Sequence, residues 1–143
     1  MQLRVMTIAD YDKVYSLWTG TAGMGLRSLD DSPAGIEKFL RRNPSTCFVA
    51  EEEGILAGVI LCGHDGRRGY IYHAAVAPQF RRRGVGKLLV DAALTALKEE
   101  GILKAALVAF QTNQLGNAFW ESMGFEKRED LVYRNKSLND ANH

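Results

Sequence analysis

An apolar strand pattern passes through a short arginine- and glycine-rich segment directly into an amphipathic helix pattern, and this transition constrains the fold most strongly. The strand pattern covers residues 70–77, and residues 79–87 read Gln-Phe-Arg-Arg-Arg-Gly-Val-Gly-Lys. Apolar side chains then recur at helical spacing from about residue 84 to residue 100, and Gly101 follows as a C-terminal stop. The transition predicts a helix that crosses over one face of a sheet between two neighbouring strands.

The segment between the two patterns has the properties of an anion site. Glycines let the backbone approach a ligand closely, and the free N–H groups at a helix start attract negative charge. Arginine side chains beside them add charge-assisted contacts. We therefore expect a phosphate or pyrophosphate group on residues 81–87, rather than a solvated basic turn.

Two familiar phosphate motifs are excluded by spacing. A P-loop requires glycine at position 81 and serine or threonine at position 88, where this chain has Arg81 and Leu88. A dinucleotide-binding fingerprint requires a third glycine at position 89, which is leucine. Nucleic-acid binding is also disfavoured, because the formal net charge is only +1 and no aromatic residues alternate with the arginines.

The remaining patterns predict further strands over residues 3–8, 46–51, 55–63 and 104–109, and a final strand or hairpin over residues 125–135. Helices are expected after Thr7-x-x-Asp10, which resembles a capping box, after Ser32-Pro33, and over residues 114–123. A glycine-rich stretch over residues 19–31 separates the first two helices and is expected to be either a binding loop or disordered. We expect one domain over residues 1–143, an α/β fold with a central mixed sheet flanked by helices.

The composition fits a globular protein, with 46% hydrophobic and 24% charged residues. No signal peptide or membrane-spanning run is visible, and a cytoplasmic location is expected. Cys47 and Cys62 lie among apolar neighbours in predicted strands and are expected to be buried free thiols. No metal site is expected.

Two stretches together resemble a known family. The first is Val76-x-Pro78 followed by Arg81-x-x-Gly84-x-Gly86, and the second is residues 113–125, Asn-Gln-Leu-Gly-Asn-Ala-Phe-Trp-Glu-Ser-Met-Gly-Phe. Both are similar to signatures of the GNAT superfamily, the acyl-coenzyme A-dependent N-acyltransferases. The expected order of elements, β-α-α-β-β-β-α-β-α-β, also matches that family over nearly the whole chain.

The resemblance implies acetyl-CoA as cosubstrate and assigns roles to individual positions. The backbone of Ala75 and Val76 would bind the pantetheine arm, and the Val76 N–H would polarise the thioester carbonyl. Asn113 would contact the pantetheine side of the cofactor, and Phe119 and Trp120 either border that arm or belong to the core. The pyrophosphate would lie on the loop, whose proposed ligands are Arg81, Arg82, Arg83, Gly84, Val85, Gly86 and Lys87.

One position departs from the family. Many members place a tyrosine one turn before the closing Gly-Phe, where its hydroxyl can protonate the departing thiolate, and this chain has Trp120 there. An indole N–H donates hydrogen bonds but does not give up its proton. The general acid is therefore unassigned, with Ser122, Tyr133 or a water molecule as candidates.

The acceptor amine must also lose a proton before it attacks. Tyr70, Tyr72 and His73 lie on the strand beside which acceptors enter in the resembled family, and imidazole exchanges protons near neutral pH. Simple alternation places Tyr72 on the face of Val76 and His73 on the other face, unless a bulge intervenes. Glu51, Glu52 and His64 are further candidates, whereas Asp30 and Asp31 are expected only to cap the second helix.

The sequence thus favours an N-acetyltransferase that moves acetyl directly from acetyl-CoA to a primary amine of a small molecule or of a peptide or protein. Two alternatives stay open: a coenzyme A-binding module without catalysis, and an interaction platform that binds no coenzyme A. The expected partners are acetyl-CoA and an amine, with neither nucleic acid nor membrane, and homodimer formation is left open.

Overall fold

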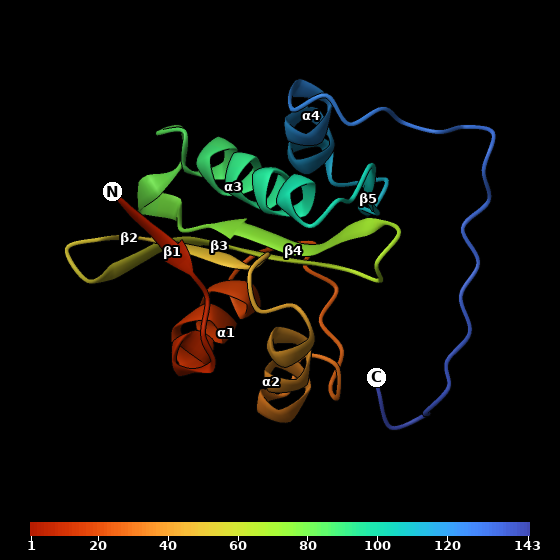
Figure 1. The fold of residues 1–143 in the computed structure, drawn as a ribbon, viewed down its shortest axis with the longest axis horizontal. Helices are drawn as coiled ribbons and strands as arrows, with labels where there is room; N and C mark the ends of the chain where they lie inside the picture. Colours follow the sequence, from red (N-terminus) through yellow and green to blue (C-terminus); the bar gives the residue numbers. More distant parts are fainter.

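The computed structural model describes residues 1–143 and places one five-stranded sheet between two layers of helices (Figure 1). The strands follow one another in the order of the sequence, and the first four are antiparallel while the fifth is parallel to the fourth. Their bounds are β1 Gln2–Val5, β2 Phe48–Glu52, β3 Ile55–His64, β4 Gly69–Val76 and β5 Ala105–Leu107. This arrangement confirms the expected mixed sheet with flanking helices.

The helices divide between the two faces of the sheet (Figure 1). Helices α1 (Tyr11–Thr19) and α2 (Pro33–Arg42) cover one face, and α3 (Val85–Glu99) and α4 (Gln114–Ser122) lie on the other side. Two short 3-10 turns, η1 (Ile8–Asp10) and η2 (Pro78–Phe80), precede α1 and α3. None of the helices has the length and the apolar character needed to cross a membrane.

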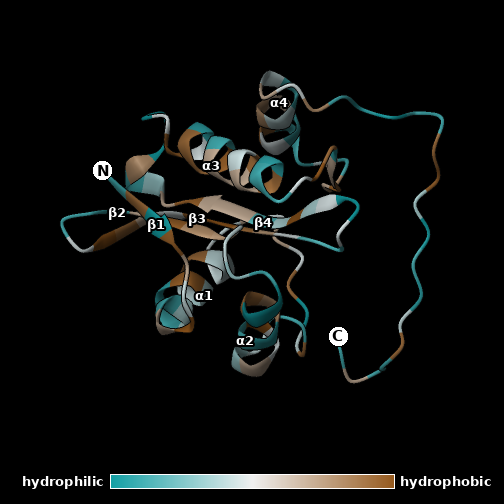
Figure 2. Cartoon of the chain, in the orientation of Figure 1, coloured by the Kyte–Doolittle hydropathy of each residue, from teal (hydrophilic) through white to brown (hydrophobic).

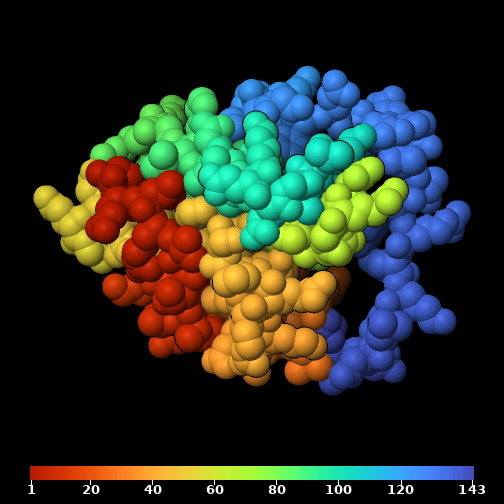
Figure 3. Space-filling view, viewed as in Figure 1, coloured from red at the N-terminus to blue at the C-terminus, as the bar shows by residue number.

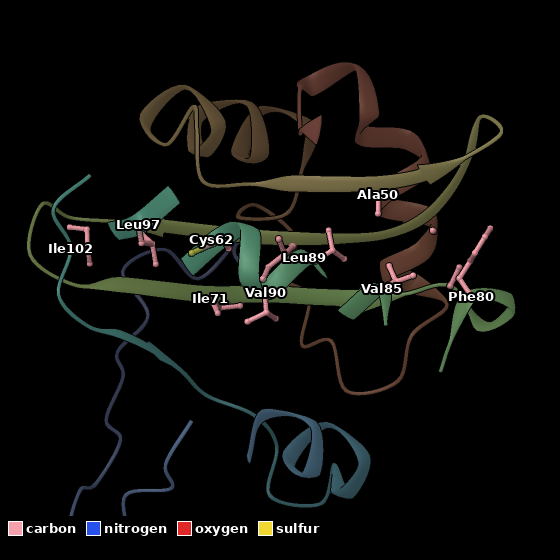
Figure 4. Close-up of a cluster of buried hydrophobic side chains, with 13 residues drawn as sticks. Ala50, Cys62, Ile71, Phe80, Val85, Leu89, Val90, Leu97 and Ile102 are labelled. Atoms are coloured by element: carbon pink, nitrogen blue, oxygen red, sulfur yellow. The ribbon is translucent and has the colours of Figure 1, made fainter. Parts of the chain in front are cut away.

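Each face of the sheet has its own apolar core. The core beneath α3 is formed by side chains of β2, β3, β4 and α3 (Figure 4), including Cys62, Ile71, Val85, Leu89, Val90 and Leu97. The core beneath α1 and α2 includes Val14, Trp18, Ile36, Cys47, Val49 and Val59. Strand β3 contributes to both cores, and Figure 2 accordingly shows β3 as predominantly hydrophobic.

The helix starts predicted from the sequence form as expected. The hydroxyl of Ser32 accepts a hydrogen bond from the Gly35 N–H at 3.0 Å, and Pro33 occupies the first position of α2. The Thr7 N–H donates to the carboxylate of Asp10 at 2.9 Å, one half of a capping box before η1 and α1.

The prediction of a strand or hairpin over residues 125–135 is wrong, because no strand forms after α4. Five consecutive charged residues, 126–130, interrupt this segment, and four of them pair locally: Lys127 with Glu129 at 3.4 Å and Arg128 with Asp130 at 2.7 Å. The chain after α4 runs as an extended tail along one side of the molecule (Figures 1 and 3). The observed element order therefore ends on a helix.

The end of the tail is held against the turn that leads into α2. The side-chain oxygen of Asn142 accepts hydrogen bonds from the Leu29 and Asp30 N–H groups at 3.0 and 2.9 Å. The Ser28 N–H donates to the carbonyl of His143 at 2.7 Å. These contacts fix residues 28–30, which directly precede Asp31.

Candidate active site

Strands β4 and β5 pair over three residues only. Gly69, Tyr70 and Ile71 are in register with residues 105–107, and β5 ends there. The Ala77 N–H donates to the Ala57 carbonyl of β3 at 2.8 Å, so the alternation of an antiparallel pair turns the N–H of Val76 away from β3. The Val76 N–H therefore points to the edge of β4 that β5 does not cover at this residue.

The arginine–glycine loop follows this unpaired edge directly. The Arg81 side chain donates to the Val76 carbonyl at 3.2 Å, which ties the loop to the end of β4. Arg82 and Gly84 have φ angles of 63° and 80°, a left-handed conformation that is uncommon for a residue other than glycine. The backbone N–H groups of Arg82, Arg83 and Gly84 donate to no group of the chain. Together with the first N–H groups of α3, which lack helical partners, they can bind an anion.

Gly84 and Gly86 are each suited to their positions for a different structural reason. A side chain at Gly84 would meet nothing within 4 Å, so its role is the backbone turn and an open approach. A β-carbon at Gly86 would lie 3.1 Å from the ring of Phe119, so its absence lets α4 pack against the start of α3. The glycine expected to admit a ligand is therefore Gly84, and Gly86 also serves packing.

Two of the loop cations already have carboxylate partners. Arg83 pairs with Glu52 at 3.0 Å and lies over the ring of Phe80, 5.2 Å from its centre. The hydrogen bond from Arg83 lowers the pKa of Glu52 below its usual value. Lys87 pairs with Asp91 one turn along α3. Arg81 and Arg82 form no ion pair and are free to meet an anion.

Helix α4 borders this region through Asn113 and its aromatic pair. The side-chain oxygen of Asn113 caps α4 by accepting from the Gly116 N–H at 3.0 Å. Trp120 contacts Phe119 and Phe125 edge-on, with ring centres 5.0 and 5.3 Å apart, and all three pack against the core beneath α3. Phe119 and Trp120 are thus partly buried against this core, on the helix that borders the candidate site.

Asn113 also faces the glycine-rich loop between α1 and α2. A hollow of about 370 Å³ lies between that loop and the start of α4. Its lining is Ala22, Gly23, Phe110, Thr112, Asn113, Gln114 and Leu115. The glycine-rich loop and the second sequence signature therefore meet at one site, although they are far apart in the chain.

A β-bulge at Tyr72 changes the face of the sheet on which the Tyr72 side chain lies. Leu61 pairs with His73 and Cys62 with Ile71, which leaves Tyr72 as the extra residue. Simple alternation predicted Tyr72 on the face of Val76, and this is wrong because the bulge resets the alternation. The Tyr72 ring instead contacts Phe39 of α2, with centres 5.5 Å apart.

His73 and Asp31 form a buried hydrogen-bonded pair beneath α1. The Nε2 atom of His73 lies 2.8 Å from Oδ1 of Asp31, and the two side chains are only 9% and 5% exposed. The second oxygen of Asp31 accepts from the Arg27 N–H at 2.7 Å, and the Tyr11 hydroxyl donates to the Asp31 carbonyl at 2.5 Å. The sequence indicated only a helix-capping role for Asp31, because its partner is distant in the chain.

The other sequence candidates are separated from this pair or occupied. Glu51 pairs with Arg4 at 2.6 Å, and His64 accepts from the Gly66 N–H in a surface turn. The Ser122 hydroxyl donates to the Phe119 carbonyl within α4. Burial raises the pKa of Tyr70 and of Tyr72, so both phenols stay protonated at neutral pH and can donate rather than accept a proton.

Comparison with known proteins gives one family. The model of the acetyltransferase (GNAT) family matches residues 11–125. Among solved structures, Ard1 from Thermoplasma volcanium is similar at 25% identity and a TM-score of 0.74, covering 87% of this chain and 82% of that one. An aminoglycoside acetyltransferase, meta-AAC0020 from an uncultured soil metagenomic sample, is similar at 23% identity and a TM-score of 0.75, covering 96% of each chain.

A third similar structure contains a coenzyme A derivative. It is AAC(6')-Iy in complex with the bisubstrate analogue CoA-S-monomethyl-acetylneamine, at 19% identity and a TM-score of 0.75. The alignment covers 95% of this chain and 97% of that chain.

Proposed function

The chain belongs to the acetyltransferase (GNAT) family, and on that premise we propose that it transfers an acetyl group from acetyl-CoA to a primary amine. The amine belongs to a small molecule or to a peptide or protein, and it attacks the thioester directly in a ternary complex. We further propose that residues 1–143 act as one catalytic domain.

The observation that carries this proposal is the continuity of the unpaired edge of β4 with the loop before α3. The free backbone N–H groups of residues 82–84, the start of α3 and the side chains of Arg81 and Arg82 would hold the pyrophosphate. The unpaired backbone of β4 would bind the pantetheine arm as a neighbouring strand would, with Val76 donating its N–H to the thioester carbonyl. Both elements lie within one short stretch of the chain.

The proposed reaction needs a proton acceptor on the amine side. As the amine nitrogen bonds to the carbonyl carbon, the carbon–sulfur bond breaks and its electron pair leaves with sulfur. His73, on the face of β4 opposite Val76, is the group we propose for removal of the amine proton. Tyr72, whose phenol stays protonated, would bind the acceptor as a hydrogen-bond donor.

No residue is needed to protonate the leaving thiolate for the reaction to proceed. A thiol has a pKa of about 8.5, so its thiolate is a fair leaving group. Omitting a general acid costs about 10²–10⁴-fold in rate, which slows the transfer without abolishing it. Trp120 is therefore compatible with turnover.

Acetyl-CoA turnover over a panel of amines tests this proposal. The panel should hold polyamines, aminoglycosides, amino acids and peptides with free N-termini, and the readouts should be release of the coenzyme A thiol and the mass of the acetylated product. We expect at least one amine to be acetylated, and we expect Arg81→Glu to weaken coenzyme A binding measured by calorimetry.

The second candidate function is a coenzyme A-binding module without catalysis, which is favoured by Trp120 at the position where many family members have a proton-donating tyrosine. Tight coenzyme A binding by the wild type, with no turnover of any amine, would support it over the enzyme. A third outcome, no affinity for coenzyme A, would leave only a structural role for the fold.

A further inference from the structure

Two buried side-chain polar atoms of this chain have no hydrogen-bond partner within it, and they belong to rings in contact. They are Nδ1 of His73 and the indole nitrogen Nε1 of Trp18. The two ring centres are 4.8 Å apart, in an edge-to-face arrangement. Leaving a buried acceptor unpaired lowers stability, so such an atom in a native structure indicates a role other than stability.

The environment of Asp31 determines which nitrogen of His73 holds a proton. Both carboxylate oxygens of Asp31 act as acceptors, Oδ1 toward His73 and Oδ2 toward the Arg27 N–H. An ionised carboxylate can only accept, so Nε2 of His73 must be the protonated nitrogen. The lone pair of the neutral imidazole is then on Nδ1, the atom that has no partner.

The bulge at Tyr72 places this imidazole on the same face of β4 as Ala75. Residues two apart on a strand are separated by roughly 7 Å, since each residue advances the chain by about 3.3 Å. A group bound at the backbone of residues 75–76 would lie about one such step from the ring, a separation that one water molecule can bridge. Trp18 contacts the ring from α1 and limits its rotation.

We propose that His73 accepts the proton of the acceptor amine at Nδ1 and that Asp31 is the residue that positions it. This inference rests on the proposed acetyl transfer. The proton moves from the amine nitrogen to Nδ1 as the carbon–nitrogen bond forms, and the resulting imidazolium is stabilised by the Asp31 carboxylate. The imidazolium then returns the proton to solvent or to the departing thiolate.

The groups that face His73 are consistent with this role. Asp31 from the loop before α2 is the nearest charge, and Tyr11 of α1 lies behind it, donating to the Asp31 carbonyl. The opposite residue on β3 is the apolar Leu61, and Trp18 is uncharged. Because Oδ2 of Asp31 accepts from the Arg27 N–H, the conformation of residues 27–31 and the position of the imidazole are linked.

Kinetics of three variants test the proposal. We expect His73→Gln to lower kcat by about 10²–10⁴-fold, the range of general acid–base catalysis, with coenzyme A affinity unchanged. Asp31→Asn should lower kcat less, and should move the acid limb of the pH–kcat/KM profile to lower pH, because the anion that favours the imidazolium is gone. Asp30→Asn, a matched loss of charge at an exposed neighbour bonded to Asn142, should change neither.

If the His73–Asp31 pair were purely structural, the variants would show different kinetics. Wild-type kcat and an unmoved acid limb in both His73→Gln and Asp31→Asn would overturn the proposal while leaving acetyl transfer intact. Absence of turnover in the wild type would instead reject the proposed function itself.

A measurement on the unaltered protein covers the case in which a variant does not fold. Nitrogen-15 NMR of labelled histidine identifies the tautomer directly. We expect a proton on Nε2 of His73 and a bare Nδ1, and a neutral ring with its proton on Nδ1 would overturn the proposal.

Discussion

The Nε2 atom of His73 lies 2.8 Å from Oδ1 of Asp31, and this bond joins residues 42 positions apart in the chain. It connects the fourth strand of the sheet to the loop before α2. The same strand presents the unpaired backbone at Val76, two residues before the η2 turn that leads into the arginine–glycine loop. The proposed donor site thus lies on the free edge of β4, and the proposed proton acceptor lies on the face of the same strand beneath α1.

Gly84 should be sensitive to substitution by alanine in two separate ways. Its φ of 80° costs a β-carbon about 1–2 kcal/mol of unfolding free energy, which chemical denaturation would measure. The change should also weaken coenzyme A binding, because it alters the first N–H groups of α3. Calorimetric titration with coenzyme A provides the second readout.

Gly54→Ala is the matched control for that change. Gly54 has a φ of 77°, and like Gly84 it has nothing within 4 Å of an added β-carbon. It should lose similar stability and keep wild-type affinity. Equal coenzyme A affinities in the two variants and the wild type would show that the loop does not bind the pyrophosphate.

Glu52→Gln should strengthen coenzyme A binding. The substitution releases Arg83 from its carboxylate partner and leaves its guanidinium free for the pyrophosphate. The gain should be about two- to five-fold, in keeping with an exposed ion pair, and it should fade at high salt. Calorimetry at two ionic strengths would detect it.

Glu37→Gln controls for the change of net charge, because it releases Arg41 on α2, away from the loop. We expect no change in affinity for that variant. If Glu52→Gln binds coenzyme A no better than Glu37→Gln does, Arg83 does not take part in the anion site.

Much of the fold followed from local signals in the sequence. The Ser32 cap, the capping box at Thr7-x-x-Asp10 and the strand-to-helix transition at residues 76–85 each depend on residues within a few positions of one another. Their hydrogen bonds and φ angles appear in the structure as expected. Such local signals also led to the prediction of an anion site on residues 81–87.

The His73–Asp31 pair could not be found in the same way. Its recognition required the bulge at Tyr72, which has no turn residue to mark it, and the approach of Asp31 from the loop before α2. The tail prediction failed for a related reason. The sequence predicts a strand or hairpin over residues 125–135, but a strand also needs a partner edge, and a local sequence pattern does not supply one.

Stability should decline in alkaline solution because of the two buried thiols. Burial raises the pKa of Cys47 and of Cys62 to about 12. Above the ordinary thiol pKa of about 8.5, each thiol therefore keeps its proton in the folded state but loses it in the unfolded chain. The stabilisation is complete below that value and is lost as the pH rises toward 12.

The slope is about 1.4 kcal/mol per pH unit for each thiol between these limits. Denaturant unfolding from pH 8 to pH 11 would measure it, with Cys47→Val and Cys62→Val each expected to flatten the decline. If the variant with both substitutions lost stability with pH as steeply as the wild type, the alkaline decline would come from groups other than these thiols.

Initial rates with both substrates varied, for an amine identified from the panel, test the central claim most directly. Direct transfer in a ternary complex predicts double-reciprocal lines that intersect, because acetyl-CoA and the amine must be bound together. Parallel lines, with an acetylated form of the protein detectable by mass spectrometry when acetyl-CoA is added alone, would contradict it.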